Sequence, residues 1–159
     1  MNTLLQTIQD TSFADWVRVS EWGYPIVLTL HSLGLALVVG VLFIIDLRII
    51  GIPRSLPLVP MRQLMRLVWL GFTVNLLTGL TLFTADAVKF YHSPTFRFKL
   101  LAVVSGVTLA AILNSIVFKA APDIDSGAAR ISPAFKGMAI LSILVWLAAI
   151  SLGRYVAYE

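Results

Sequence analysis

Four blocks of apolar residues divide this 159-residue chain, and each block is long enough to cross a lipid bilayer. A crossing takes about 20 residues at the helical rise of about 1.5 Å per residue. With 58% hydrophobic and 13% charged residues, the chain also has too few charges to cover the surface of a soluble domain. We therefore predict an all-α integral membrane four-helix bundle, embedded in the lipid bilayer over most of its length.

The predicted spans cover residues 25–45, 64–85, 96–118 and 135–155, within a bundle of residues 23–159. Pro25 suits the first turn of a helix, where its missing N–H costs least. The segments between the spans are rich in proline or polar residues, so we expect loops there, including residues 86–94 and 119–133. Residues 1–22 precede the bundle, and their alternation of apolar and polar residues predicts an amphipathic helix that lies along the membrane interface.

Basic residues indicate how the bundle is oriented. The loops after the first and third spans carry seven of them: Arg48, Arg54, Arg62, Arg66, Lys119, Arg130 and Lys136. The opposite face carries five: Arg18, Lys89, Arg97, Lys99 and Arg154. By the positive-inside rule, the seven face the cytoplasm of a bacterial inner membrane and both termini lie on the periplasmic side. Because these cations stand singly or in pairs at the ends of apolar blocks, the net charge of +4 indicates membrane orientation and no nucleic-acid partner.

Small or polar residues recur at every fourth position in three of the spans. The rows are Ser32, Ala36 and Gly40, then Gly71, Asn75 and Gly79, and then Ala102, Gly106 and Ala110. Such rows let helix backbones approach closely where lipid supplies no hydrophobic drive for association. We predict that all three are packing seams.

His31 is the most informative residue for function. It stands about seven positions into the first span, roughly 10 Å below the surface at the helical rise. A titratable group there is expensive unless it is paired or functional. A neutral imidazole can ligate heme iron or a metal, and Gly34 one turn later would leave room for a flat cofactor. The alternative is a neutral histidine hydrogen-bonded to a neighbouring helix. The other histidine, His92, falls in a predicted turn, so a second axial ligand would come from another copy of the chain, from Met or Lys, or not at all.

Other polar residues are expected at the level of His31. Lys99 opens the third span and Arg154 closes the fourth, while Glu21 precedes the first. The topology places all three near the periplasmic side, where the two cations could hold cofactor propionates or another anion. The alternative for each cation is snorkelling to the lipid headgroups.

A further set of polar residues is interpreted as structural. Asp46 and Arg48 stand at the end of the first span and are expected to form an interfacial ion pair. Asn75 in the second span is expected to hydrogen-bond another helix, and Asn114 lies late in the third. The sequence has no phosphate-binding glycine loop, no His-Glu-x-x-His helix and no nucleophile elbow, so it designates no catalytic residue and leaves enzymatic activity open.

The order of features resembles a family of small uncharacterised bacterial four-helix membrane proteins. The resembling stretches are Glu21-Trp22-Gly23-Tyr24-Pro25, His31-Ser32-Leu33-Gly34-Leu35-Ala36, Asp46-Leu47-Arg48-Ile49-Ile50-Gly51, Phe96-Arg97-Phe98-Lys99-Leu100 and Gly153-Arg154-Tyr155. More remotely, a His early in one span and a Lys-Leu opening the third are similar to copper-resistance D-type proteins and to the heme-binding protoporphyrinogen oxidase of the HemJ type. In that oxidase the Lys-Leu helix carries a further histidine, where this chain has Asn114.

Three functional hypotheses stay open at this stage. The first is a small redox or cofactor-binding subunit that binds heme b through His31, with Lys99 or Arg154 near anionic groups. The second is a copper transport or permeation accessory in which His31 and the Met residues bind the metal. The third is a structural subunit, either a homodimer or part of a larger membrane complex.

Overall fold

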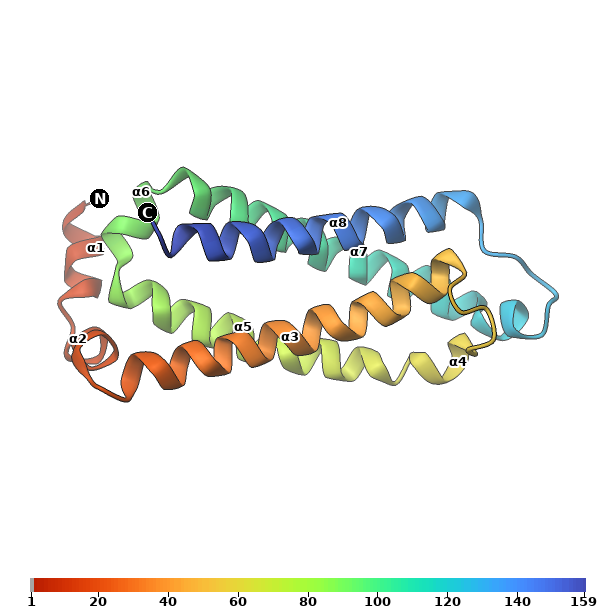
Figure 1. The fold of residues 1–159 in the computed structure, drawn as a ribbon, viewed down its shortest axis with the longest axis horizontal. Helices are drawn as coiled ribbons and strands as arrows, with labels where there is room; N and C mark the ends of the chain where they lie inside the picture. Colours follow the sequence, from red (N-terminus) through yellow and green to blue (C-terminus); the bar gives the residue numbers. More distant parts are fainter. Residues whose placement is uncertain (1) are drawn as a thin grey trace.

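The computed structural model describes residues 2–159, and within them every regular element is a helix. The helices are α1 (Asn2–Gln9), α2 (Ser12–Val19), α3 (Gly23–Ile50), α4 (Leu58–Met61), α5 (Leu64–Ala85), α6 (Ala87–His92), α7 (Pro94–Asp125) and α8 (Pro133–Val156). Both ends of the chain lie at one end of the molecule together with α1, α2 and α6, and we call this the termini end (Figure 1). The opposite end, which holds α4, is called the α4 end.

Four helices are long and apolar enough to cross a membrane, namely α3, α7, α8 and the α4–α5 segment. Their number agrees with the four predicted spans, and α5 has the predicted bounds, residues 64–85. The structure extends α3 by five residues beyond the predicted end, to Ile50, and Gly51 terminates it in the left-handed conformation with φ of 114°. Glycine adopts this conformation without the steric penalty that a Cβ brings.

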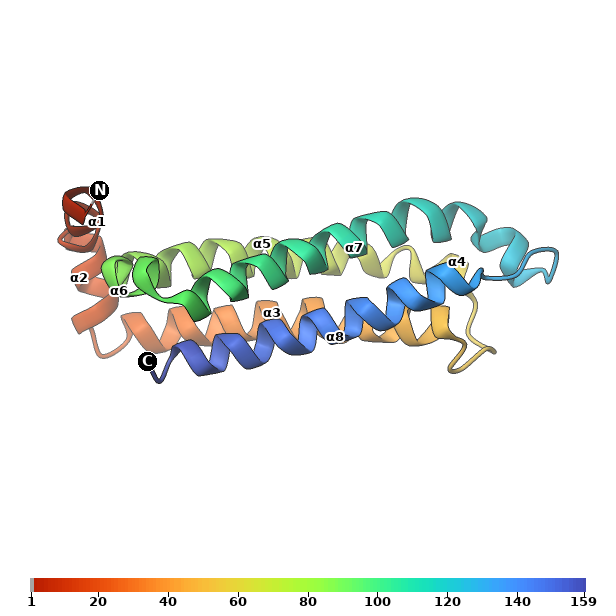
Figure 2. The ribbon, with the colours of Figure 1, turned by 90° about the horizontal axis from the view of Figure 1, so that it is seen from above.

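The long helices associate in two pairs. α3 packs along α5, α7 packs along α8, and the pairs meet mainly where α3 contacts α8. α5 and α7 approach each other less closely than the helices within either pair, although the ring of Phe83 on α5 stacks on that of Phe96 on α7. In Figure 1 the ribbons of the two pairs diverge toward the termini end, and Figure 2 shows the same four helices from above, running along the length of the molecule.

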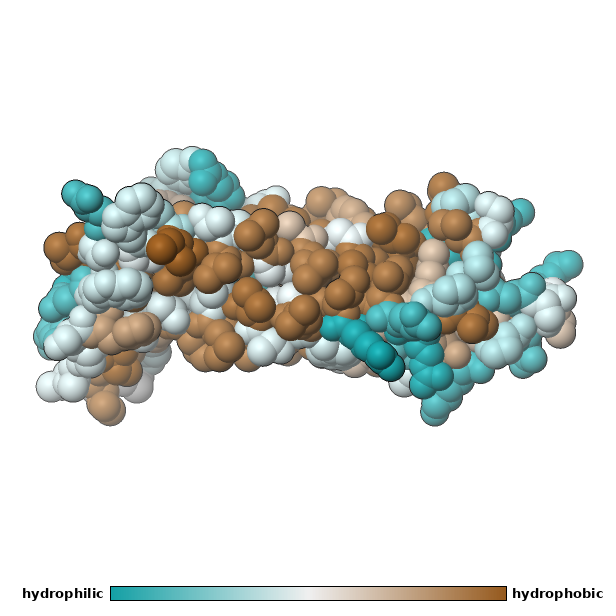
Figure 3. Space-filling view, turned by 90° about the horizontal axis from the view of Figure 1, so that it is seen from below, coloured by the Kyte–Doolittle hydropathy of each residue, from teal (hydrophilic) through white to brown (hydrophobic). Residues whose placement is uncertain are grey.

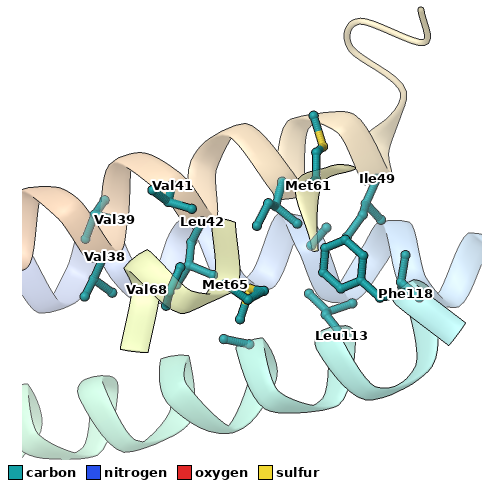
Figure 4. Packing of buried hydrophobic residues seen from close by; sticks show 14 of the residues in the cluster. Val38, Val39, Val41, Leu42, Ile49, Met61, Met65, Val68, Leu113 and Phe118 are labelled. Carbon is teal, nitrogen blue, oxygen red and sulfur yellow. The ribbon is translucent and has the colours of Figure 1, made fainter. Parts of the chain in front are cut away.

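The apolar core lies toward the α4 end. In α3 its fully buried members begin at Val38 and end at Ile49, and they pack against residues such as Met65, Leu113 and Phe118 (Figure 4). His31 stands one to two turns before the first of these core residues. The half of the molecule nearer the termini therefore holds its polar side chains outside the main apolar core.

The N-terminal segment differs from the single amphipathic helix that we predicted. It forms two helices, because Thr11 ends the first and caps the second by accepting a hydrogen bond from the backbone N–H of Ala14 at 3.2 Å. α1 and α2 bury Leu5 and Val17. The side-chain oxygen of Gln9 also accepts from the backbone N–H of Val88, which ties α1 to α6.

Two predicted loops are partly helical. Residues 87–92 form α6, and α7 continues to Asp125 through Pro122, so the expected loop at 119–133 begins only after that helix ends. The last turn of α7 is stabilised by contacts with another segment of the chain. The carboxylate of Asp125 accepts hydrogen bonds from the backbone N–H groups of Leu58 and Val59 at 2.8 and 2.9 Å. A proline in this last turn removes one hydrogen bond, which these tertiary contacts offset.

The surface fits the membrane assignment. On the face that Figure 3 shows, hydrophobic residues form a belt across the middle of the molecule, and hydrophilic residues gather toward both ends. Large apolar side chains such as Leu101 and Val104 are more than three-fifths exposed. A soluble monomer rarely exposes a contiguous apolar surface of this kind.

The predicted packing rows have different outcomes. The row of Gly71, Asn75 and Gly79 on α5 faces α3, so it is confirmed as a packing seam. The row on α7 is confirmed as well, because its Gly106 faces Trp146 on α8. The row of Ser32, Ala36 and Gly40 was wrongly predicted to be a seam within one chain. All three residues are exposed, and a Cβ added at Gly40 would meet nothing within 4 Å.

Candidate functional site

A polar group around His31 joins α3 to α5 in the termini half. The Nδ1 atom of His31 lies 3.1 Å from the backbone carbonyl of Asn75 and 3.1 Å from the hydroxyl of Thr78. The side-chain amide of Asn75 donates back to the backbone carbonyl of His31 at 2.8 Å. The predicted interhelical hydrogen bond of Asn75 is therefore present, and its partner is the backbone of the histidine itself.

These contacts assign the tautomer of the imidazole. A carbonyl oxygen can only accept, and the Thr78 hydroxyl donates its hydrogen to the carbonyl of Val74 at 2.6 Å. Nδ1 must therefore carry the hydrogen, and in the neutral imidazole this leaves a lone pair on Nε2. None of the residues in the described chain forms a hydrogen bond with Nε2.

Glycines bring the two helices together beside this group. A Cβ at Gly34 would lie 2.9 Å from the carbonyl oxygen of Gly71, and one at Gly71 would lie 2.9 Å from that of Gly34. Gly79 leaves space for the imidazole, since a Cβ there would be 3.1 Å from its Cε1 atom. The room that we expected beside Gly34 for a flat cofactor is thus filled by the backbone of α5.

Lys99 reaches the same region from α7. It is half-buried and lies within electrostatic range of His31. Gly153 of α8 makes space for it, because a Cβ there would lie 3.3 Å from Cε and 3.5 Å from Nζ of Lys99. Lys99 forms no ion pair with any residue from 2 to 159. The region therefore carries positive charge that no described carboxylate compensates.

The other residues expected near His31 do not join it. Arg154 is exposed, and its guanidinium carbon stacks 5.0 Å from the ring centre of Tyr158. Glu21 is exposed at the start of α3, and His92 is exposed at the end of α6, where its ring meets that of Tyr91 edge-on. Thr78, Gly79 and Gly153 belong to the group but were not predicted as site residues, because only the packing of α5 and α7–α8 shows which faces meet His31.

The expected ion pair between Asp46 and Arg48 is wrong. Arg48 instead lies 3.5 Å from the carboxylate of Asp125, and its Nε donates to the carbonyl of Leu56. Residues two apart on a helix point about 200° away from each other, so these two side chains cannot meet. Arg48 and Asp125 together join the α4 ends of three segments of the chain.

Asp46 occupies a different environment. It is 1% exposed, and neither of its carboxylate oxygens has a hydrogen-bond partner among the described residues. The polar side chain close to it is the fully buried Ser142 of α8. A carboxylate is costly to bury in the interior of a membrane protein. Asp46 is therefore a second buried polar residue of interest, separate from the His31 group.

Asn114 takes part in neither group. It lines a cavity between α5 and α7, together with Arg62 and Arg66. Over residues 2–159, no three His, Cys, Asp or Glu side chains come together in an arrangement that could hold a metal ion. A metal bound at His31 would therefore need ligands of another kind or from another molecule.

Comparison with known proteins places the chain in a family. A family model described as a family of unknown function (DUF6644) matches residues 8–159. The chain belongs to this family. The match confirms the resemblance to an uncharacterised family and gives no support to the remote likeness to copper-resistance D-type or HemJ-type proteins. No curated protein and no solved structure matches the chain.

Proposed function

We propose that this protein is a small redox or cofactor-binding membrane subunit, and that His31 binds heme b through Nε2. The observation that carries the proposal is the state of the imidazole: Nδ1–H is held by the Asn75 carbonyl, and Nε2 has no partner in the described chain. Histidines that ligate metals usually donate their other ring hydrogen to a carbonyl or carboxylate, which fixes the ring and raises its basicity.

The charge near His31 supports the same ligand. Heme carries two propionates, and anionic groups buried in a membrane protein require cationic partners. Lys99 supplies a cation without a carboxylate partner on the described residues. When bound, the heme would supply one-electron redox chemistry, and the residues of this chain would ligate it and neutralise its charge.

One chain offers one histidine for this role. His92 lies on α6 with its side chain exposed, so it does not belong to the His31 group. The iron would take any second protein ligand from His31 of a second copy across a two-fold axis, or from a Met or Lys side chain. One heme per two chains would indicate the arrangement with two copies, and one heme per chain would exclude it.

The membrane setting belongs to the proposal as well. We place the four long helices as a bundle in a bacterial inner membrane, with the termini end on the periplasmic side. The support is the excess of basic residues in the connections at the α4 end, seven against five. His31 and Lys99 would then lie nearer the periplasmic surface.

The test is an absorption spectrum of the chain purified in mild detergent, oxidised and dithionite-reduced, after expression with added heme precursor. A Soret band with sharp reduced α and β bands is expected, and His31→Ala should abolish it. His92→Ala is the matched control and should retain the bands. A blank spectrum from folded protein, or bands that survive His31→Ala, would refute heme ligation by His31.

A further inference from the structure

The α4 end holds a cavity of about 480 Å³. It opens between the start of α5 and the facing side of α7. Its polar lining consists of Arg62, Gln63 and Arg66 from one side and Asn114 from α7. These residues are at the opposite end of the long helices from His31, so an inference drawn from them is independent of the heme proposal.

Two arginines give the cavity its charge. Arg62 and Arg66 stand four positions apart, a spacing that puts two side chains on one face of a helix. Both are exposed, and neither forms an ion pair with a carboxylate of the described residues. Guanidinium groups present paired donors that match the oxygens of a phosphate. The cavity is therefore suited to a phosphate-bearing anion.

Amide groups extend this donor set. The side chains of Gln63 and Asn114 line the same cavity, and neither is engaged in a hydrogen bond with another residue in the range 2–159. Asn114 comes from α7, so a ligand held by it and by Arg66 would bridge α5 and α7. A polar ligand would fill a gap that the chain leaves open.

The α5 side of the cavity also has an apolar part. Met65 is 4% exposed, and Trp69 lies one helical turn from it toward the middle of the molecule with 39% of its surface exposed. In this direction the hydrophilic surface of the α4 end gives way to the hydrophobic belt (Figure 3). A ligand that fits both the polar and the apolar parts of this lining has an anionic head and an apolar tail.

We propose that this cavity binds the phosphate headgroup of an anionic phospholipid. Arg62 and Arg66 pair with the phosphate, Gln63 and Asn114 donate amide hydrogen bonds to it, and an acyl chain runs along Trp69. Basic pockets between membrane helices are known to hold anionic headgroups in this way. The lipid would join α5 to α7 at the α4 end.

Native mass spectrometry of the full chain in neutral detergent tests this site. Palmitoyl-oleoyl phosphatidylglycerol and the phosphatidylcholine with the same acyl chains are added in turn. Phosphatidylglycerol should bind more tightly, and Arg62→Gln with Arg66→Gln should weaken its binding roughly thirtyfold. The matched control, Arg54→Gln with Arg130→Gln, removes two exposed arginines outside the cavity and should leave binding unchanged.

Three results would overturn the proposal. The first is equal binding of the two lipids, and the second is an equal loss in both double variants, which would mean that net charge alone attracts the lipid. The third is tight binding of glycerol 3-phosphate without acyl chains, which would assign the cavity to a soluble phosphate ester. A thermal melt checks that the cavity variant folds, and Arg66→Gln alone replaces it if it does not.

Discussion

The contact of α3 with α5 at Gly34 gives the sharpest prediction for stability. A methyl group at this position would lie 2.9 Å from the Gly71 carbonyl oxygen and 3.0 Å from the Asn75 nitrogen. Both neighbours are backbone atoms that cannot rotate away, so the two helices must separate by a few tenths of an ångström. Gly34→Ala should therefore strain the whole contact between α3 and α5 and cost the overpacking energy of about 1–3 kcal/mol.

The separation would also weaken the hydrogen bonds beside it. The His31 ring to the Asn75 carbonyl, at 3.1 Å, and the Asn75 amide to the His31 carbonyl, at 2.8 Å, both cross between these helices. An interhelical hydrogen bond in a membrane protein contributes about 0.6 kcal/mol on average. With the overpacking, we expect Gly34→Ala to lower the free energy of unfolding by about 2–3 kcal/mol.

The assay is reversible unfolding in mixed micelles, followed by circular dichroism as the fraction of dodecyl sulfate is raised. Gly40→Ala is the matched control, since it lies on the same helix, makes the same chemical change and meets nothing within 4 Å. It should be neutral or slightly stabilising, because alanine favours the helix over glycine. If Gly34→Ala and Gly40→Ala differ by less than about 0.5 kcal/mol, the reasoning from close backbone contact is wrong.

Three further predictions concern charged groups. Asp46→Asn should stabilise the fold by about 1 kcal/mol at pH 8, because an ionised carboxylate without a hydrogen bond costs more to bury than an amide. Asp125→Ala should destabilise the fold by about 3 kcal/mol, because it leaves Arg48 buried without its ion-pair partner. Unfolding in mixed micelles measures the stability of both the Asp46 and the Asp125 variants. Hydrogen bonds from Ser93 and Thr95 hold the pKa of Glu159 below its usual range. Their stabilising effect is therefore present at pH values above the usual carboxyl pKa, and it is lost as the pH falls through the lowered pKa of Glu159. A carbon-13 titration of Glu159 should show this low midpoint, and Ser93→Ala should raise it.

Each of these has an outcome that contradicts it. A less stable Asp46→Asn protein would mean that the carboxylate has a partner, such as a bound cation, in the membrane. An Asp125→Ala protein as stable as the wild type would show that Arg48 keeps its position through the Leu56 carbonyl alone. A Glu159 midpoint that Ser93→Ala leaves unchanged would exclude the hydrogen bond as the cause.

The sequence alone was a good guide to the element that each apolar block forms. Lipid offers no hydrogen bonds to the backbone, so a long apolar block must satisfy its own peptide groups as a helix. The length of the block then sets the length of the helix, and the predicted bounds of α5 agree with the structure. Helix ends were harder to predict where tertiary contacts extend them, as at Asp125, which binds backbone groups 66 and 67 residues away.

His31 shows how far a functional site could be predicted. Its depth in an apolar block marked it as a residue of interest, and the row of Gly71, Asn75 and Gly79 marked a packing surface. Nothing in the sequence said that this row packs against His31, because the rotation of each helix about its axis depends on side chains contributed by all its neighbours. The tautomer of the imidazole follows only from that packing.

Hydropathy along the chain was enough to predict four helices long and apolar enough to span a membrane, and the position of the rare polar residues along them. These properties depend on hydropathy and chain length, which are local. The tertiary structure decided which polar residues meet. It pairs Arg48 with Asp125, leaves Asp46 without a hydrogen bond, brings Lys99 toward His31 and opens a cavity beside Asn114. Such pairings join residues that are far apart in the chain, so only the packing of helix faces determines them.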